Sequence, residues 1–462
     1  MKKRLLILAT AWLSIVSTAT VQAQLTAGAQ IRTRGEYRNG QGTLLSKNAN
    51  IYPDYFISQR TRMFAGYTGY RFKTYASIQD VRVWGQDSST INRTTSGLLN
   101  GILVNEAWGE IMLNDTAPKS KIENLSLKIG RQEIAYDDQK ILGSLDWLQQ
   151  ARRHDAAVLK FSNKGWTADL GAAYNQNAER GKDISYNGSP SSYAAGTNAI
   201  GTMYKSMQYL YLGKKFFFGD ASLLCFKDDF SKYTKPSAAS PIKNYGNAVW
   251  SRITTGAYIN ATIKRRLLVT ASYYHQMGQD KDGVTMDANL VSITTSMQLG
   301  RKLFVGPGVD YLSGNDGTKA LTASSTNQRF DPLYGTPHKF WGTMDYFYVA
   351  SGSGKQGLVD MFFKIKYNLK DNLTLLLDVH GFEVANTLSN GKGGAQNPYL
   401  GTEVDFTLKY NMTKIINIEA GYSYMAATNS MASAQVKNVA NPNLSASWAY
   451  VMVSIKPNFL AK

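Results

Sequence analysis

Cysteine, histidine and long apolar runs are scarce in this sequence. The chain of 462 residues contains one cysteine, Cys225, and four histidines. A single cysteine cannot form an intramolecular disulfide, so a disulfide-stapled secreted scaffold is excluded. Beyond the first residues, no segment offers roughly 18 uncharged apolar residues in a row, which excludes membrane-spanning helices. Any insertion into a membrane would therefore have to use strands.

Recognisable catalytic patterns are also missing. The histidines are His154, His275, His338 and His380, and none lies in an HExxH pattern or beside a GxSxG pattern. A hydrolase needs a nucleophile, a base and an orienting group, or a metal cluster. The acid pair Asp137-Asp138 lies in an expected loop, where solvation or a bound cation explains it better than acid–base chemistry. We predict no enzyme activity, no cofactor and no metal site, with a hydrolase as the remote alternative.

The first residues predict export. Residues 2–4 are Lys-Lys-Arg, and an apolar stretch follows over 5–16. Small residues then lead to Val-Gln-Ala at 21–23, which fits a signal-peptidase site. We therefore expect residues 1–23 to be a cleaved signal peptide and residues 24–462 to form a single domain.

The charge balance is strongly positive. Lys and Arg number 51 against 33 Asp and Glu, which gives a formal net charge of +18. Such an excess favours anionic partners such as nucleic acid, lipopolysaccharide phosphates or an acidic solute. Nucleic acid does not fit an exported protein. The basic residues alternate with apolar ones in strand-like runs, which indicates a charged lumen or rim.

Alternation of apolar and polar residues predicts long strands. Apolar residues at odd positions of 359–369 alternate with Asp, Lys and Asn at even positions, apart from Phe362, and after a turn the pattern resumes over 373–379. Residues 400–410 and 416–424 repeat it. Strands that face lipid on one side and water on the other show this pattern. A soluble sandwich would not need so many long, charge-interrupted strands between such unequal loops.

Short turns and long loops give the strand count. Short turns are expected near 69–70, 114–121, 163–165, 216–220, 264–266, 300–302, 370–372 and 411–414. Long loops are expected at 38–55, 85–101, 135–151, 176–205, 229–247, 278–287, 313–356, 385–399 and 427–444. These seventeen connections predict a single transmembrane antiparallel β-barrel of about 18 strands, with short periplasmic turns and long extracellular loops. Loop 313–356 is unusually long and aromatic, and we expect it to fold into the lumen or over it.

Strand parity predicts which side chains line the pore. The expected pore-lining cations are Arg32, Arg34, Arg60, Arg62, Arg82, Arg131, Arg152 and Arg153, and the expected acidic partners in the lumen are Glu36, Asp80, Glu106 and Glu110. Trp84 is expected to face inward with Asp80 and Arg82. A surplus of guanidinium groups would attract carboxylates and select anions. The alternative is that these charges pair across neighbouring strands and only brace the barrel.

Several segments resemble one family. They are GAQIRTRGEY (28–37), SQRTR (58–62), SIQDVRVWG (77–85), NEAWGE (105–110), IGRQEIAYDDQKILGSLDWLQQ (129–150), HDAAVL (154–159), PHKFWGTMDY (337–346) and residues 400–424. Together they resemble the alginate-export family of outer-membrane porins. The resemblance implies an 18-stranded barrel with an Arg-rich constriction that passes anionic polysaccharide. It also implies that the pathway is lined by Arg32, Arg34, Arg60, Arg62, Arg82 and Arg131.

The expected function is a passive outer-membrane channel for anionic solutes, in particular uronate or alginate-like polysaccharide or oligosaccharide. A general anion-preferring porin for small acidic solutes is the alternative. The expected partners are outer-membrane lipid and lipopolysaccharide, the barrel-assembly machinery, and an anionic carbohydrate or another small acidic solute, but no nucleic acid.

Overall fold

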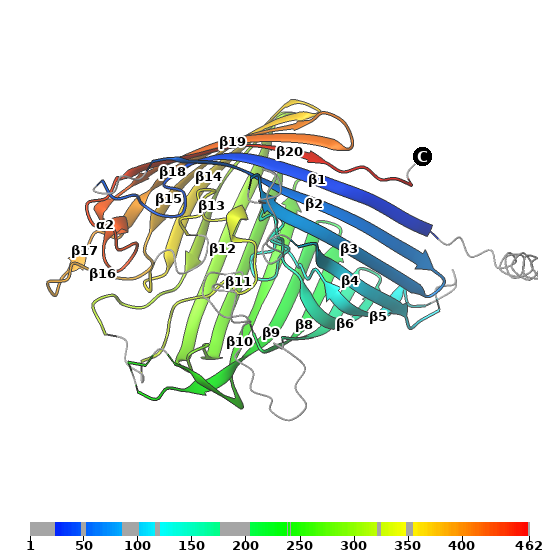
Figure 1. The fold of residues 1–462 in the computed structure, drawn as a ribbon, viewed down its shortest axis with the longest axis horizontal. Coiled ribbons are helices and arrows are strands. Elements are labelled where there is room, and N and C mark those ends of the chain that lie inside the picture. The colour runs from blue at the N-terminus through cyan, green and yellow to red at the C-terminus, as the bar shows by residue number, and fades with distance from the viewer. Residues whose placement is uncertain are drawn as a thin grey trace, which may run out of the picture.

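The computed structural model describes most of the chain. The described residues are 24–47, 52–85, 101–115, 121–175, 204–237, 239–240, 242–320, 325–347 and 354–460, with the side chain of Asn247 left out. The expected signal peptide, residues 1–23, lies outside them. Within the described residues, eighteen strands form one antiparallel sheet (Figure 1). The sheet closes into a barrel where β1 pairs with β20, from Ile31 opposite Ile455 to Asn39 opposite Ser447.

The strand bounds follow the predicted alternation. The barrel strands are β1 (Gln24–Asn39), β2 (Asp54–Gly69), β3 (Phe72–Val83), β4 (Leu103–Met112), β5 (Asn124–Gln132), β6 (His154–Asn163), β7 (Trp166–Tyr174), β8 (Ser206–Phe216), β9 (Gly219–Thr234), β10 (Asn244–Ile263), β11 (Leu267–Gln279), β12 (Thr285–Leu299), β13 (Leu303–Leu312), β14 (Leu358–Lys370), β15 (Leu373–Glu383), β18 (Tyr399–Asn411), β19 (Ile416–Ala427) and β20 (Ser445–Ile455). The prediction of an eighteen-stranded antiparallel barrel is confirmed.

Short turns gather at one end of the barrel and long loops at the other. The short elements inside the loops are η2 (Pro337–Lys339), the small hairpin of β16 (Leu388–Ser389) and β17 (Ala395–Gln396), and α2 (Asn429–Ala432). The loops in the structure are shorter than the expected loops 229–247 and 278–287, because β9 continues to Thr234 and β12 begins at Thr285. Tyr233 packs edge-on against Trp250 with ring centroids 5.0 Å apart, and such pairing extends this hairpin beyond the apolar part of its sequence.

The outer face of the barrel is apolar. Large hydrophobic side chains exposed on it include Ile31, Met63, Leu223, Phe363 and Val451. A closed sheet satisfies its backbone hydrogen bonds internally, so its outer face can lie in lipid. The protein is therefore an integral outer-membrane protein. Among the described residues, no helix is long and apolar enough to cross a membrane.

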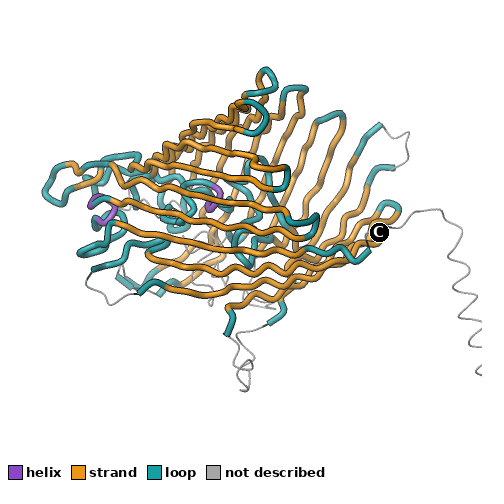
Figure 2. Tube along the Cα trace, turned by 90° about the horizontal axis from the view of Figure 1, so that it is seen from above, coloured by secondary structure: helices purple, strands orange, loops and turns teal. Residues whose placement is uncertain are grey.

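The hydrophobic core lies inside the barrel and is built from inward-facing strand residues together with loop residues. Loop 133–153, between β5 and β6, meets the long loop 313–357 between β13 and β14, where Gly143 N donates to Tyr334 O at 2.9 Å and Tyr334 N to Ile141 O at 3.0 Å. Tyr334 and Trp341 are almost fully buried, with 2% and 1% exposed. Figure 2 shows loop segments lying between the strand walls. The two loops thus occupy part of the space that the strands enclose.

Candidate functional site

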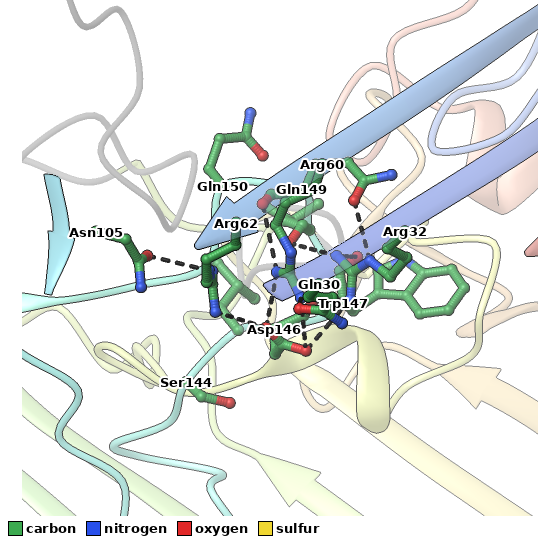
Figure 3. A network of polar contacts seen from close by, with 12 residues as sticks. Gln30, Arg32, Arg60, Arg62, Asn105, Ser144, Asp146, Trp147, Gln149 and Gln150 are labelled. Carbon is green, nitrogen blue, oxygen red and sulfur yellow. Dashed lines mark hydrogen bonds and ion pairs between the residues drawn. The ribbon is translucent and has the colours of Figure 1, made fainter. Parts of the chain in front are cut away.

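One carboxylate lies among three inward-facing arginines (Figure 3). Asp146, on loop 133–153, forms ion pairs with Arg60 at 2.8 Å, Arg32 at 3.2 Å and Arg62 at 4.0 Å. The register of β1 and β2 places Arg32 directly opposite Arg60. Like charges in that position repel. Asp146 supplies the opposite charge that lets both side chains point inward.

The arginines also bind the backbone of the same loop. Arg32 donates to the carbonyl oxygens of Asp146 at 2.7 Å and Leu148 at 3.0 Å. Arg34 donates to the carbonyl of Trp147 at 3.0 Å, and its guanidinium lies 4.3 Å from the centre of the Trp147 ring. Charge-assisted hydrogen bonds of this kind are the strong ones. Residues 146–149 are therefore clamped onto the wall formed by β1 and β2.

Burial separates the arginines into two groups. The side chains of Arg32, Arg34 and Arg60 are 5%, 5% and 1% exposed, whereas that of Arg62 is 14% exposed. Loop 133–153 covers Arg32, Arg34 and Arg60. These three side chains therefore bind the loop, and their guanidinium groups are not accessible to a solute. Arg62 donates to Gln79 Oε1 at 2.7 Å and to Asn105 Oδ1 at 3.2 Å. Of the arginines on β1 and β2 that bind Asp146, Arg62 is the most accessible.

The inward orientation predicted for Asp80, Arg82 and Trp84 is wrong. In the register of β2 and β3, Arg82 lies opposite Gln59 and Asp80 opposite Thr61, on the face turned away from Arg60 and Arg62. Asp80 and Arg82 neutralise each other with a contact of 2.6 Å. A neutralised pair beyond the apolar band can face outward near the rim. The tight turn at Gly69 fixes the parity of β3, and Ser77 and Gln79 are buried on the inner face instead.

Arg131 also faces outward, against the prediction. It lies opposite Ala107 on β4 and Asp155 on β6, and its guanidinium forms a two-point contact with the Asp155 carboxylate at 2.8 Å and 2.8 Å. The neighbouring Gln132 is the buried, inward residue. Because side chains alternate along a strand, one position of error in the strand's parity exchanges the two faces.

Arg152 and Arg153 lie in loop 133–153 and not on the barrel wall. Arg152 is 3% exposed and donates to the carbonyl of Gly335, so it joins the two inward loops. Arg153 donates to the carbonyl of Gln150 at 2.8 Å. Both side chains therefore have contacts that fix loop structure.

The predicted acids have different partners. Buried Glu36 accepts from Arg34 and Arg38, each at 2.8 Å, and from Trp448 Nε1 at 3.1 Å. Glu110 accepts from Ser126 Oγ at 2.6 Å and lies 3.9 Å from Lys73. Glu106 accepts from the backbone nitrogen of Glu133 at 3.2 Å. Glu36 is thus an arginine partner, whereas Glu110 pairs with a lysine.

Asp146 is the functional residue that the sequence analysis missed. Burial disfavours its charge, but Arg60, Arg32 and Arg62 outweigh that effect and hold the pKa of its carboxyl below the ordinary value. It belongs to the Leu145 to Gln150 stretch, LDWLQQ, at the end of the loop segment already singled out. The sequence shows that Asp146 lies beside a tryptophan in a long loop. The neighbouring residues do not show which strand this acid contacts.

An aromatic row continues the inner wall next to Arg62. Phe64, Tyr75 and Trp108 come from β2, β3 and β4, with successive ring centroids 6.0 Å and 5.7 Å apart. Lys128 Nζ lies 3.9 Å from the centre of the Trp108 ring. The three rings are stacked in a row, and a cation lies over the last of them.

The acid pair Asp137-Asp138 has protein partners. Asp137 accepts from Tyr211 Oη at 2.8 Å and Ser222 Oγ at 2.9 Å, and Asp138 Oδ1 accepts from Lys140 N at 3.0 Å. Among the residues that the structure describes, no three His, Cys, Asp or Glu side chains are grouped so that they could hold a metal ion. These contacts give the pair a structural role in anchoring loop 133–153 to β8 and β9.

Comparison with known proteins supports the family and the fold. Residues 23–178 match the family model described as alginate export. No curated protein sequence matches the chain. Among solved structures, OccK9 (OpdG) of Pseudomonas aeruginosa is 13% identical with a TM-score of 0.58, covering 94% of this chain and 99% of that one. OccD3 (OpdP) of the same organism is 10% identical with a TM-score of 0.57, covering 96% and 93%. At these identities the two structures show a shared fold alone.

Proposed function

We propose that this outer-membrane barrel, similar to the alginate-export family over its first third, is a passive channel for anionic saccharides such as uronate oligomers. The observation that carries the proposal is the charge balance around Asp146. Arg32, Arg60 and Arg62 surround that single carboxylate, so this ion-paired cluster carries two more positive than negative charges. Cations beside a narrow passage favour anions and oppose cations.

Arg62 is the side chain best placed to meet a solute. It is the least buried of the three arginines, and its guanidinium already binds neutral amide oxygens of Gln79 and Asn105. A passing carboxylate can replace these weaker acceptors with a two-point, charge-assisted contact. The contact is released easily because the amides take over again.

The aromatic row supports a saccharide over a small acidic solute. The C–H faces of sugar rings pack on aromatic side chains, and the stacked rings of Phe64, Tyr75 and Trp108 form an apolar stretch of the inner wall that a sugar ring can contact. A general porin for small acids needs the cations but has no use for such a row. A general porin for small acidic solutes would therefore leave the aromatic row without a function.

A liposome-swelling panel tests the proposal. Proteoliposomes are challenged with glucuronate, a uronate tetramer, and the neutral sugars glucose and maltotetraose. We expect the acidic sugars to enter faster than neutral sugars of the same length. Equal rates for acidic and neutral sugars at each length would contradict the proposal. Fast glucuronate with an excluded uronate tetramer would favour the small-solute porin.

A further inference from the structure

A separate polar cavity lies at the loop end of the barrel. It has a volume of about 430 Å³ and is lined by residues 315–317, Lys319, Arg329, 354–356 and 434–435. We call it the mouth cavity. Its walls come from both ends of loop 313–357 and from the loop between β19 and β20. Sites of this size, roughly 300–1,000 Å³, are typical for small-molecule ligands.

The cavity is cationic. Lys319, Arg329 and Lys355 line it against a single acid, Asp316, which is already bound by Lys319 at 3.3 Å and by Thr318 Oγ1 at 2.7 Å. Arg329 donates only a long bond of 3.5 Å to the carbonyl of Gly354. In the described part of the chain, no carboxylate forms an ion pair with Arg329 or Lys355. Both cations are therefore available to an anion.

Gln356 supplies a second, independent indication of a ligand. The residue is 4% exposed, and no hydrogen-bond donor among the described residues reaches its Oε1. A buried acceptor without a donor costs about 1–3 kcal/mol, so such groups usually have a partner. A ligand hydroxyl is a donor of the right kind, whereas a fully ionised simple anion has none to give.

The backbone holds this arrangement open. Gly354 has φ of +74°, and a Cβ at that position would lie 2.7 Å from Gln356 Oε1. Gln435 fixes the opposite wall, because its Nε2 donates to Gly317 O at 2.8 Å and its Oε1 accepts from Ser389 N at 2.9 Å. Gly354, Gln356 and Gln435 all line the cavity, so the buried, unpartnered oxygen lies beside it.

We propose that the mouth cavity is an extracellular binding subsite for an acidic sugar unit, which it holds before or after passage through the barrel. Arg329 and Lys355 bind the carboxylate, and Gln356 Oε1 accepts from a ring hydroxyl. The inference rests on the proposed function for its substrate class. It adds a place of recognition on loops that lie outside the arginine cluster.

Calorimetric titration of the full-length protein in detergent micelles tests this subsite. The probes are a mannuronate tetramer, neutral maltotetraose, and glutarate, a dicarboxylate without hydroxyls. Wild type should bind the tetramer and neither of the other two at comparable concentration. The double change Arg329→Gln and Lys355→Gln should weaken tetramer binding about tenfold or more, in keeping with two lost charge-assisted contacts. Gln356→Met should weaken it with no change in folding on heat-modifiability gels.

Lys392→Gln is the matched control, since Lys392 is exposed on the neighbouring hairpin turn and does not line the cavity. It should bind like wild type. Unchanged tetramer binding in the double variant or in Gln356→Met would overturn the subsite, as would equal binding of glutarate. Tetramer binding that depends on these residues in a pore that swells equally with acidic and neutral sugars would sink the proposed function and leave the subsite standing. Faster swelling with acidic than with neutral sugars, combined with unchanged tetramer binding in the variants, would support the proposed function and overturn the subsite.

Discussion

Arg60 and Asp146 form a 2.8 Å ion pair across 86 residues of sequence, and this contact fixes loop 133–153 to the inner wall of the barrel. Arg60 is 1% exposed on its side chain, so the pair joins a fully covered strand residue to a loop. The negative charge of Asp146 offsets the repulsion between the arginines that lie side by side on β1 and β2. It also makes Asp146 the residue on which the position of the loop depends.

Removing that carboxylate should release the loop. In Asp146→Asn, the arginines keep their contacts to backbone carbonyls but lose the shared charge. We expect a loss of about 1–3 kcal/mol in local stability and larger current fluctuations in single-channel recordings. The reversal potential should move further toward chloride, because a negative charge has gone. A quiet channel with an unchanged reversal potential would show that Asp146 does not hold the loop.

The second inward loop should also limit the current. Asp331 on loop 313–357 binds Arg252 of β10 at 2.6 Å, and Tyr334 donates to Asp228 of β9 at 3.0 Å. Combining Asp331→Asn with Tyr334→Phe weakens the first of these side-chain attachments and removes the second, while Arg252 keeps its partner Asp228. Mean single-channel conductance should rise. A folded, heat-modifiable variant with wild-type conductance would count against a constricting role for this loop.

Stability should depend on pH through Asp137. Burial raises the pKa of its carboxyl from 3.8 to about 6, although Tyr211 and Ser222 donate hydrogen bonds to it. Because the folded-state pKa lies above the unfolded value, this contribution is complete below about pH 3.8 and is lost as the pH rises through about 6. The unfolding temperature should therefore fall between about pH 4 and about pH 7.

Asp137→Asn isolates the effect. Burial also raises the pKa of Glu133, so some pH dependence should remain in the variant, with a smaller slope. Asp146 has a lowered pKa and loses its contribution only as the pH falls below its ordinary range, outside this window. An unfolding temperature with the same pH slope in wild type and Asp137→Asn would contradict the assignment.

The aromatic row should act on sugars and not on small ions. Trp108→Ala removes the ring that stacks on Tyr75 and lies under Lys128. Block of the chloride current by a uronate tetramer should weaken by roughly threefold to tenfold, in line with the loss of one aromatic contact. Trp84 is 55% exposed and donates to Gln59 on the outer face. Trp84→Ala is therefore the control, and the tetramer should block it as it blocks wild type. If the tetramer blocks both variants equally, the aromatic row does not contact the saccharide on its way through the barrel.

The barrel could be predicted from the sequence because its strands and turns depend on residues that are close together in the chain. Side-chain alternation along 359–369 and the turn at 370–372 fix the strands and their connection without knowledge of distant residues. The same rule failed at Arg82 and Arg131, where charged residues stand near strand ends and face outward against partners on the same or the next strand. Near the rim, polarity no longer tells the two faces apart.

The cluster around Asp146 was beyond prediction for a different reason. Arg32 and Arg60 are placed by strand register, but their partner comes from a loop more than eighty residues away from either. Neither period nor composition determines where such a loop folds. The sequence predicts that the arginines on β1 and β2 point inward. It does not predict that a loop covers three of them.

The central claim is that inward arginines beside Asp146, and Arg62 above all, give the channel a preference for anions. It is tested most directly by the reversal potential in planar bilayers under a potassium chloride gradient, comparing Arg62→Gln with Arg82→Gln. The two changes remove the same charge, from the inner face in one case and the outer face in the other. The account predicts a chloride-over-potassium preference that falls by roughly twofold or more in Arg62→Gln and stays at the wild-type value in Arg82→Gln. Equal shifts in both variants, or no shift in Arg62→Gln, would contradict it.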